Sequence, residues 1–107
     1  MRVIAGTRKS LTLKSVPGMG TRPTTDRIKE TLFNIISPYL YESRFLDVFA
    51  GSGGIGIEAL SRGASFCCFI EKEPKAVSVI RENIKKTGFE KESEIIKNNA
   101  ANIDIFL

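Results

Sequence analysis

The sequence predicts an α/β fold built on a parallel sheet, and two observations predict it. From residue 45 onward, short apolar runs alternate with segments whose apolar residues recur at helical spacing, in the order strand, helix, strand, helix, strand. A glycine-rich run at residues 51–56 separates the first of these strands from the first helix. Such alternation is typical of parallel sheets with crossover helices. The length of 107 residues suffices for one small domain.

A hairpin and a helix are expected in front of this alternation. Residues 2–4 and 11–14 read as two short strands joined by a turn at residues 6–9, and residues 16–20 form a loop rich in helix breakers. A helix then begins near Thr24 or Thr25, which are favourable N-caps, and Pro38 is expected to stop it. Its predicted core-facing positions are Ile28, Leu32, Ile35 and Ile36.

The later elements have clear local boundaries. A strand at residues 45–49 leads through the glycine run into a helix that ends near Arg62, with Gly63 as its C-cap. A second strand covers residues 66–70, and a helix runs from Pro74 to Gly88. Residues 93–97 read as a weak third strand, and residues 100–107 as the opening of another helix.

The charge is concentrated at the front of the chain. The net charge is +4, and residues 1–29 hold seven basic residues against a single acidic one, Asp26. This distribution indicates a surface that faces phosphates; a solvated basic hairpin without a partner is the alternative. The seven are Arg2, Arg8, Lys9, Lys14, Arg22, Arg27 and Lys29.

Several classes of protein are disfavoured. No stretch approaches the roughly 20 apolar residues of a membrane span, and the first residues lack a secretory h-region, so a cytoplasmic location without membrane contact is expected. Cys67 and Cys68 are adjacent and should point to opposite faces of a strand, which excludes a mutual disulfide and predicts buried thiols. Histidine is absent, and no metal site is expected.

The glycine run is the principal candidate for a binding site. It fits G-x-G-x-x-G between a strand and a helix, and Glu71 follows Gly51 by 20 residues, where a carboxylate can accept hydrogen bonds from ribose hydroxyls. These features suit a dinucleotide and S-adenosylmethionine alike, and a tight turn without a ligand is a third interpretation. Asp47, four residues before Gly51, disfavours a pyrophosphate and favours the cationic methionine part of S-adenosylmethionine.

Two segments resemble a known family. Residues 46–53, Leu-Asp-Val-Phe-Ala-Gly-Ser-Gly, closely resemble the first motif of class I amino-methyltransferases. Residues 21–34, Thr-Arg-Pro-Thr-Thr-Asp-Arg-Ile-Lys-Glu-Thr-Leu-Phe-Asn, resemble the N-terminal signature of the bacterial 16S ribosomal RNA guanine-N2 methyltransferase family. Residues 2–6 and 56–64 are similar to further segments of that family, so the resemblance extends from Arg2 to about Ala100.

The resemblance implies a fold, a cofactor and a substrate. The fold is the class I methyltransferase (Rossmann-like) parallel sheet of seven strands, of which only the first three are present. Residues 1–40 would form a basic, RNA-facing hairpin and helix, and residues 41–107 the first half of the S-adenosylmethionine-binding domain. The partner would be 16S ribosomal RNA or a small-subunit assembly particle. Implied cofactor-binding residues are Asp47, Phe49, Ala50, Gly51, Ser52 and Gly53 at the methionine, Glu71 at the ribose, Asn99 and Ala100 at the adenine, and Arg22, Thr24 and Arg27 in a flap.

One family motif is absent. The family places Asp/Asn-Pro-Pro-Phe/Tyr after its fourth strand, where it positions the amine of the acceptor base, and no proline follows Pro74 here. The sequence therefore predicts an N-terminal fragment that has no catalytic residues of its own. Because the fourth strand would pair beside the first, the fragment is expected to dimerise, exchange segments or aggregate.

Three rival functions remain open from the sequence. An NAD-dependent oxidoreductase would use the same glycine pattern. A nucleic-acid-binding module without catalysis would use the basic hairpin alone. A methyltransferase acting on DNA adenine or cytosine is closest to the favoured interpretation. The acceptor motif, where the sequence would help most to distinguish the two, is absent.

Overall fold

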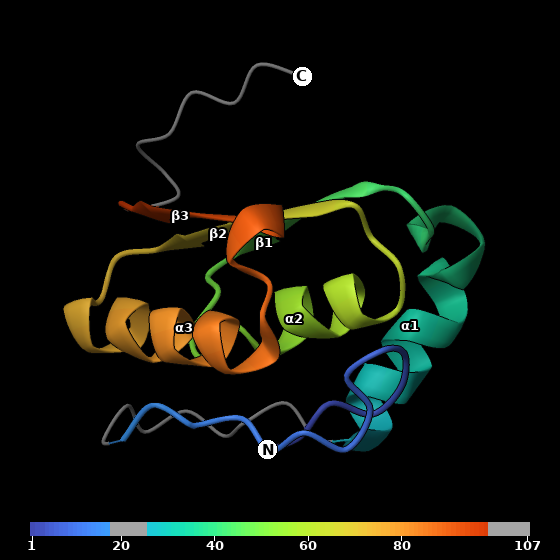
Figure 1. Ribbon diagram of the computed structural model, residues 1–107, viewed down its shortest axis with the longest axis horizontal. Coiled ribbons are helices and arrows are strands. Elements are labelled where there is room, and N and C mark those ends of the chain that lie inside the picture. Colours follow the sequence, from blue (N-terminus) through green and yellow to red (C-terminus); the bar gives the residue numbers. More distant parts are fainter. Residues whose placement is uncertain (18–25, 99–107) are drawn as a thin grey trace.

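The computed structural model describes residues 1–17 and 26–98, and these form an α/β fold. In chain order the elements are α1 (Asp26–Leu40), β1 (Arg44–Val48), α2 (Gly54–Ser61), β2 (Phe66–Glu71), α3 (Pro74–Thr87), the 3₁₀ turn η1 (Glu90–Glu92) and β3 (Ser93–Lys97). The three strands make one parallel sheet in the order β1-β2-β3. Helices α2 and α3 lie against the same face of this sheet (Figure 1). The predicted fold class is confirmed.

The core lies between the sheet and these helices. Cys67 and Phe69 of β2 face the helices and are fully buried, together with Ile57 of α2 and Ile80 of α3. The opposite face of the sheet carries none of the described helices. Leu46 and Val48 of β1 are 40% and 37% exposed there, and Cys68 is half-buried. The two thiols thus take opposite faces, as predicted, but Cys67 is buried and Cys68 only partly so, whereas both were predicted to be buried.

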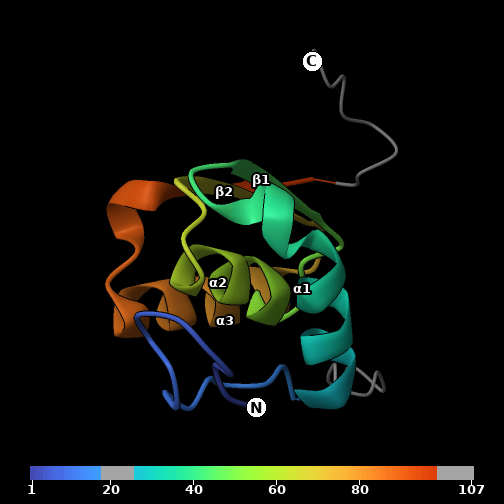
Figure 2. The same cartoon turned by 90° about the vertical axis from the view of Figure 1, so that its right-hand side faces the viewer.

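The N-terminal segment, residues 1–17, forms a further layer beneath the helices (Figure 2). Its two arms run antiparallel and meet through one isolated bridge, Arg2↔Thr12. The predicted hairpin is therefore present, but its arms are not regular strands. The reason lies in the next amides: the N–H groups of Ile4 and Ala5 donate to the Glu58 carboxylate at 2.9 and 3.1 Å. The N–H groups of Val3, Ser10 and Leu13 bond between the arms, but the next amides bond to α2, so the ladder does not extend further.

Helix α1 departs from the prediction at its end. It continues through Pro38 to Leu40. A proline in the last turn removes only the bond to the carbonyl of Asn34, and the Ser37 hydroxyl donates to that carbonyl at 3.4 Å. The missing donor is therefore partly replaced, and the helix does not stop.

The face of α1 that meets the core also differs from the prediction. Phe33 and Leu40 are buried and Leu32 and Ile36 are partly buried, but Ile28 and Ile35 are 58% and 68% exposed. The spacing identified an apolar stripe on α1, but the stripe that packs against the core is shifted around the helix towards Phe33 and Leu40.

The remaining boundaries follow the local signals. Gly63 after α2 and Gly88 after α3 have φ of 115° and 75°, as expected for residues that end helices. Strand β1 stops at Val48, one residue before its predicted end, because Phe49 turns with φ of 61°. The expected N-caps Thr24 and Thr25 and the expected helix at residues 100–107 lie outside the described residues.

Candidate functional site

The glycine loop follows the carboxyl end of β1 and leads into α2. Gly51 and Gly53 have φ of 58° and 83°, a conformation that side chains rarely adopt, and the Gly53 N–H donates to the Ala50 carbonyl at 2.8 Å. A Cβ built on Gly56 would overlap Phe69 and Cys67, whereas one on Gly51 would meet nothing within 4 Å. Gly56 therefore permits close packing inside, and Gly51 leaves open space outside the loop.

Glu71 joins the loop to the start of α3. At the end of β2 it is 7% exposed, and its Oε1 accepts a hydrogen bond from the Gly51 N–H at 2.8 Å. Its Oε2 accepts from the N–H groups of Lys72 and Glu73 at 3.0 and 2.9 Å. The carboxylate therefore lies at the loop, as the spacing predicted, and it organises the backbone there.

Asp47 is a buried carboxyl one strand position before the end of β1. It is 8% exposed, and its Oδ2 accepts a hydrogen bond from the Gly56 N–H at 3.0 Å. Burial raises the pKa of Asp47 to about 6, the Gly56 N–H opposes that rise, and the charge of Glu71 adds to it. The ionised form lacks a neutralising cation among the described residues, so a cationic ligand group would stabilise it.

Asp47 makes folding stability depend on pH. Its pKa is about 6 in the folded protein against 3.8 in the reference state, so the folded protein holds this proton more tightly than the unfolded chain. The contribution of Asp47 to the free energy of unfolding therefore falls by roughly 2–3 kcal/mol as pH rises from about 4 to about 6. It stays at this lower level at higher pH. We expect Asp47→Asn to raise the melting temperature at pH 7.5 and to have little effect at pH 4.5. Parallel pH profiles of the two proteins would contradict this.

The other predicted cofactor residues lie on the glycine loop, in α1, or outside the described residues. Phe49, Ala50 and Ser52 lie on the loop with Gly51 and Gly53, and Phe49 projects 76% exposed. The Ser52 hydroxyl lies 3.5 Å from the Met1 sulfur. Arg27 is exposed in the first turn of α1. Arg22, Thr24, Asn99 and Ala100 fall outside the described residues.

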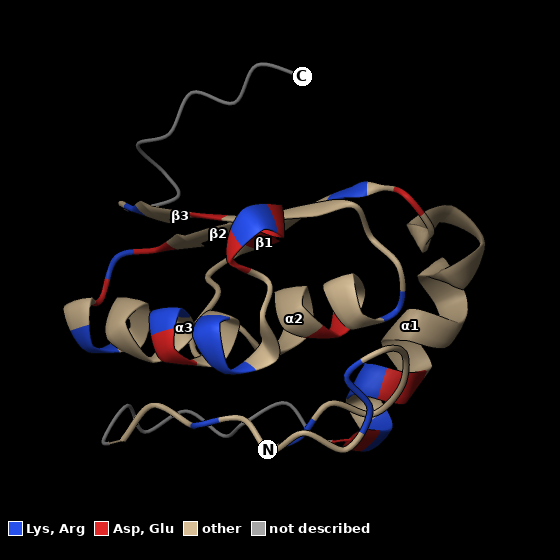
Figure 3. Ribbon diagram, in the orientation of Figure 1, with Lys and Arg blue, Asp and Glu red and all other residues tan. Residues whose placement is uncertain are grey.

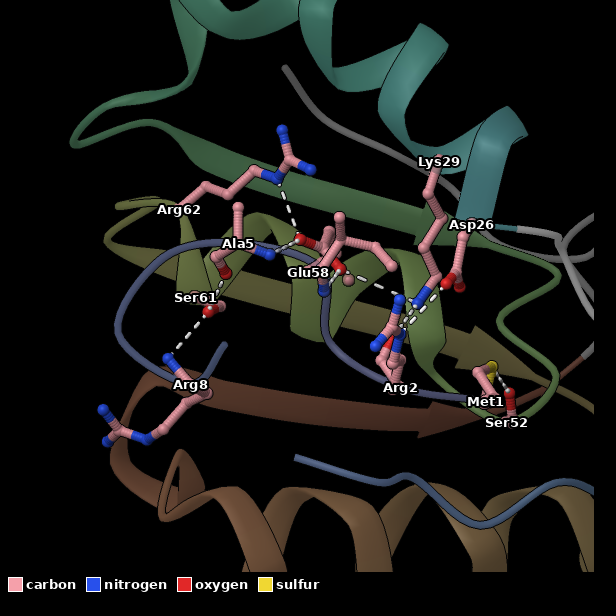
Figure 4. A network of polar contacts seen from close by, with 12 residues as sticks. Met1, Arg2, Ala5, Arg8, Asp26, Lys29, Ser52, Glu58, Ser61 and Arg62 are labelled. Atoms are coloured by element: carbon pink, nitrogen blue, oxygen red, sulfur yellow. Dashed lines mark hydrogen bonds and ion pairs between the residues drawn. The ribbon is translucent and has the colours of Figure 1, made fainter. Parts of the chain in front are cut away.

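A buried polar network that sequence reasoning missed holds the N-terminal segment against α1 and α2 (Figure 4). Lys29 and Glu58 are both 0% exposed, and their Nζ and Oε1 atoms are 3.7 Å apart. Lys29 also donates to the Arg2 carbonyl at 2.8 Å, and Arg62 Nε donates to Glu58 Oε2 at 2.8 Å. A charged residue inside the apolar run of α2 was the only available signal for Glu58.

This network corrects the count of phosphate-facing bases. Lys29 is buried and cannot contact a phosphate. Arg2 pairs with Asp26 at 3.0 Å, and Lys14 pairs with Glu82 at 3.1 Å. The Arg8 guanidinium donates to the Thr87 carbonyl at 2.6 Å and lies 4.5 Å from the centroid of the Phe89 ring. Figure 3 marks basic positions in blue along residues 1–17 and at the start of α1. In the N-terminal segment Arg2, Lys9 and Lys14 are exposed and Arg8 is half-buried, but all of these except Lys9 already have partners among the described residues.

Other kinds of site are not found in the described part of the chain. It holds no group of three or more His, Cys, Asp or Glu side chains that could bind a metal ion. None of its helices is long and apolar enough to cross a membrane. A shallow groove between α3 and β3, lined by Arg81, Ile84, Lys85, Glu90, Ser93 and Ile95, does not include the glycine loop.

Comparison with known proteins decides the family. The sequence profile of the family described as "Conserved hypothetical protein 95" matches residues 1–104. The chain belongs to this family. A relative from Bacillus subtilis, named "Putative rRNA methyltransferase YlbH", is 49% identical over 100 residues, which cover 94% of this chain and 54% of the relative. Ribosomal RNA small subunit methyltransferase D of Haemophilus influenzae is 39% identical, over 94% of this chain and 52% of that protein.

Solved structures of methyltransferases share the fold of this chain. The structure described as "Putative methyltransferase yhhF from Escherichia coli" has a TM-score of 0.82 and 35% identity, covering 94% of this chain and 53% of that one. An RNA methyltransferase from Salinibacter ruber, solved with S-adenosyl-L-homocysteine, shares the fold with a TM-score of 0.70 at 23% identity, over 78% of this chain and 54% of that one. The resemblance to ribosomal RNA methyltransferases and the class I fold are confirmed. The chain spans about half the length of the relatives it matches.

Proposed function

We propose that this chain is the S-adenosylmethionine-binding part of an enzyme that methylates the exocyclic N2 of a guanine in small-subunit ribosomal RNA. The observation that carries the proposal is the glycine loop, where the buried Asp47 carboxylate accepts from the Gly56 N–H and the space beside Gly51 is open. The names of the relatives support ribosomal RNA as the substrate. The choice of guanine N2 comes from the resemblance of residues 21–34 to that enzyme family. Such a substrate agrees with the cytoplasmic location expected from the sequence.

The residues present fit the cofactor. S-adenosylmethionine supplies an activated methyl group on a sulfonium and carries an ammonium group. Asp47 offers a buried negative charge whose Oδ2 alone is engaged by a hydrogen bond from the described residues, so Oδ1 can accept from a cationic group. Gly51 leaves the ligand side of the loop free of side chain, and Glu71 lies beside it. Phe49 would provide an apolar wall.

The two parts of the chain would divide the work. Residues 41–107 would hold the cofactor, and residues 1–40 would face the RNA. Lys9 in the turn of the N-terminal segment is exposed and suited to contact phosphate oxygens. Arg22, Thr24 and Arg27 would complete a flap over the site, and Asn99 and Ala100 would lie at the adenine. The acceptor amine would be positioned by residues beyond those of this sequence.

The direct test is methylation of ribosomal RNA. We expect the longer enzyme that contains this sequence to transfer a methyl group from S-adenosylmethionine to unmodified small ribosomal subunits, with N2-methylguanine as the product. Nucleoside analysis by mass spectrometry measures this. Methyladenine or methylcytosine in DNA, with none in RNA, would replace the proposal by its closest rival.

The 107-residue chain alone is the matched control in that assay. It lacks an Asp/Asn-Pro-Pro-Phe/Tyr run, and we propose that it binds cofactor without turnover. Methyl transfer by the purified chain would show that the acceptor amine is positioned by residues within it.

We also infer that the 107-residue chain associates with itself through the open side of the sheet. β1 is an edge strand of the described sheet, and its own Leu46 and Val48 are exposed on the face without described helices. An uncovered apolar edge favours pairing between chains. We expect dimers or larger species in analytical ultracentrifugation, and Val48→Lys should shift them towards monomer. A stable monomer in the unsubstituted chain would contradict the inference.

A further inference from the structure

Asn83, in the C-terminal half of α3, is a buried amide whose hydrogen-bonding groups are engaged by two distant segments. Asn83 is 1% exposed. Nδ2 donates to the carbonyls of Lys14 and Ser52, both at 2.9 Å, and Oδ1 accepts from the Lys14 N–H at 2.8 Å. The Lys14 N–H must face an oxygen, so the orientation of the amide is fixed by its partners. Both donors of the amide are therefore used.

The two segments that Asn83 joins are the N-terminal segment and the glycine loop. Lys14 is 69 residues from Asn83 in sequence, and Ser52 is 31 residues from it. Ser52 lies between Gly51 and Gly53. The N-terminal segment has a second contact with the same loop residue, because the Ser52 hydroxyl lies 3.5 Å from the Met1 sulfur. The Met1 carbonyl in turn accepts from the Leu13 N–H at 2.7 Å, next to Lys14.

The other anchors of the segment do not reach the loop. Ser61 donates to the Ala5 carbonyl at 2.6 Å and accepts from the Arg8 N–H at 2.9 Å. Glu58 holds the amides of Ile4 and Ala5. Asn83 is thus the described side chain that bonds both to the segment and to the backbone of the glycine loop.

We propose that Asn83 is a positioning residue that couples the N-terminal segment to the glycine loop, so that the placement of the segment and the affinity for cofactor depend on one another. The inference rests on the proposed function, in which this loop binds the cofactor and this segment faces RNA. Its physical basis is that a buried carbonyl without a donor is costly, so loss of the amide would leave the Lys14 and Ser52 carbonyls without this donor and would loosen both segments where the amide joins them. The amide acts through the loop backbone.

Amide hydrogen exchange tests the coupling without any ligand. In Asn83→Asp the carboxylate still accepts from the Lys14 N–H but repels the two carbonyls. We expect the N–H groups of Gly51 and Gly53, which bond to Glu71 and Ala50, to exchange about tenfold faster relative to amides of β2. Ser61→Ala removes the hydrogen bonds to Ala5 and Arg8, near the turn of the segment, and leaves the bridge from Lys14 through Asn83 to Ser52 intact. It should therefore leave this ratio within about twofold of the unsubstituted protein.

A uniform acceleration of all amides in Asn83→Asp, or an equal loop effect in Ser61→Ala, would overturn the inference. Titration with S-adenosylhomocysteine separates it from the proposed function. Unsubstituted protein that binds, with Asn83→Asp weakened about tenfold and Ser61→Ala little changed, supports both. Equal binding by all three proteins overturns the coupling alone. Absence of binding in the unsubstituted protein counts against the proposed site, while the exchange ratio still decides the coupling.

Discussion

Glu58→Gln is expected to destabilise the fold by about 3–5 kcal/mol, because it leaves the fully buried Lys29 ammonium without its anionic partner. The amide also cannot serve Ile4, Ala5 and Arg62 as a carboxylate does. A loss of this size is a large share of the stability of a small domain. Chemical denaturation of the variant and of the unsubstituted protein measures it.

An exposed ion pair supplies the control. Glu82 pairs with Lys14 at 3.1 Å, and both side chains are more than half exposed. Glu82→Gln should therefore cost less than about 1 kcal/mol. Adding Lys29→Met to Glu58→Gln should recover part of the loss, since no buried ammonium then remains. If Glu58→Gln and Glu82→Gln have equal effects, the network does not hold the N-terminal segment in place.

Gly51→Val is expected to abolish cofactor binding, with a loss on the order of a hundredfold or more, while the protein remains folded. The new side chain would project into the open space beside the loop, where a Cβ meets no atom within 4 Å apart from those of the neighbouring residues in the chain. The φ of 58° imposes a backbone cost of about 1–2 kcal/mol. Calorimetric titration with S-adenosylhomocysteine and a melting curve separate the two effects.

Gly88→Val is the matched control for Gly51→Val. Gly88 also has a left-handed backbone, with φ of 75°, and lies at the end of α3. Its built Cβ has only the flexible Arg8 side chain near it, at 3.7 Å. The backbone cost should be similar, and binding should persist. A Gly51→Val protein that binds as well as Gly88→Val would move the cofactor away from this loop.

The elements that the sequence predicted well are those with local punctuation. Pro74 starts α3 and Gly88 ends it, and each acts through its own backbone preference. The glycine loop and the carboxylates at its two strand ends were predictable for the same reason. Asp47 and Glu71 occupy fixed places relative to strands whose carboxyl ends meet at one edge of the sheet.

The errors arise where a distant partner decides. Nothing in the sequence around Lys29 indicates that its ammonium contacts Glu58 and the Arg2 carbonyl, so Lys29 was predicted to be a surface base. The exposed side of α1 at Ile28 and Ile35 shows that apolar spacing does not reveal which stripe meets the core. The hairpin was predicted to be more regular than it is, because the amides of Ile4 and Ala5 donate to Glu58, which lies far along the chain.

The most direct test of the central claim is a calorimetric titration of this chain with S-adenosylhomocysteine, with NAD titrated in parallel. The account predicts that S-adenosylhomocysteine binds, that NAD does not, and that Gly51→Val removes the binding. Binding of NAD alone, or binding of S-adenosylhomocysteine that Gly51→Val leaves undiminished, would contradict the assignment of Asp47 and the glycine loop as the cofactor site.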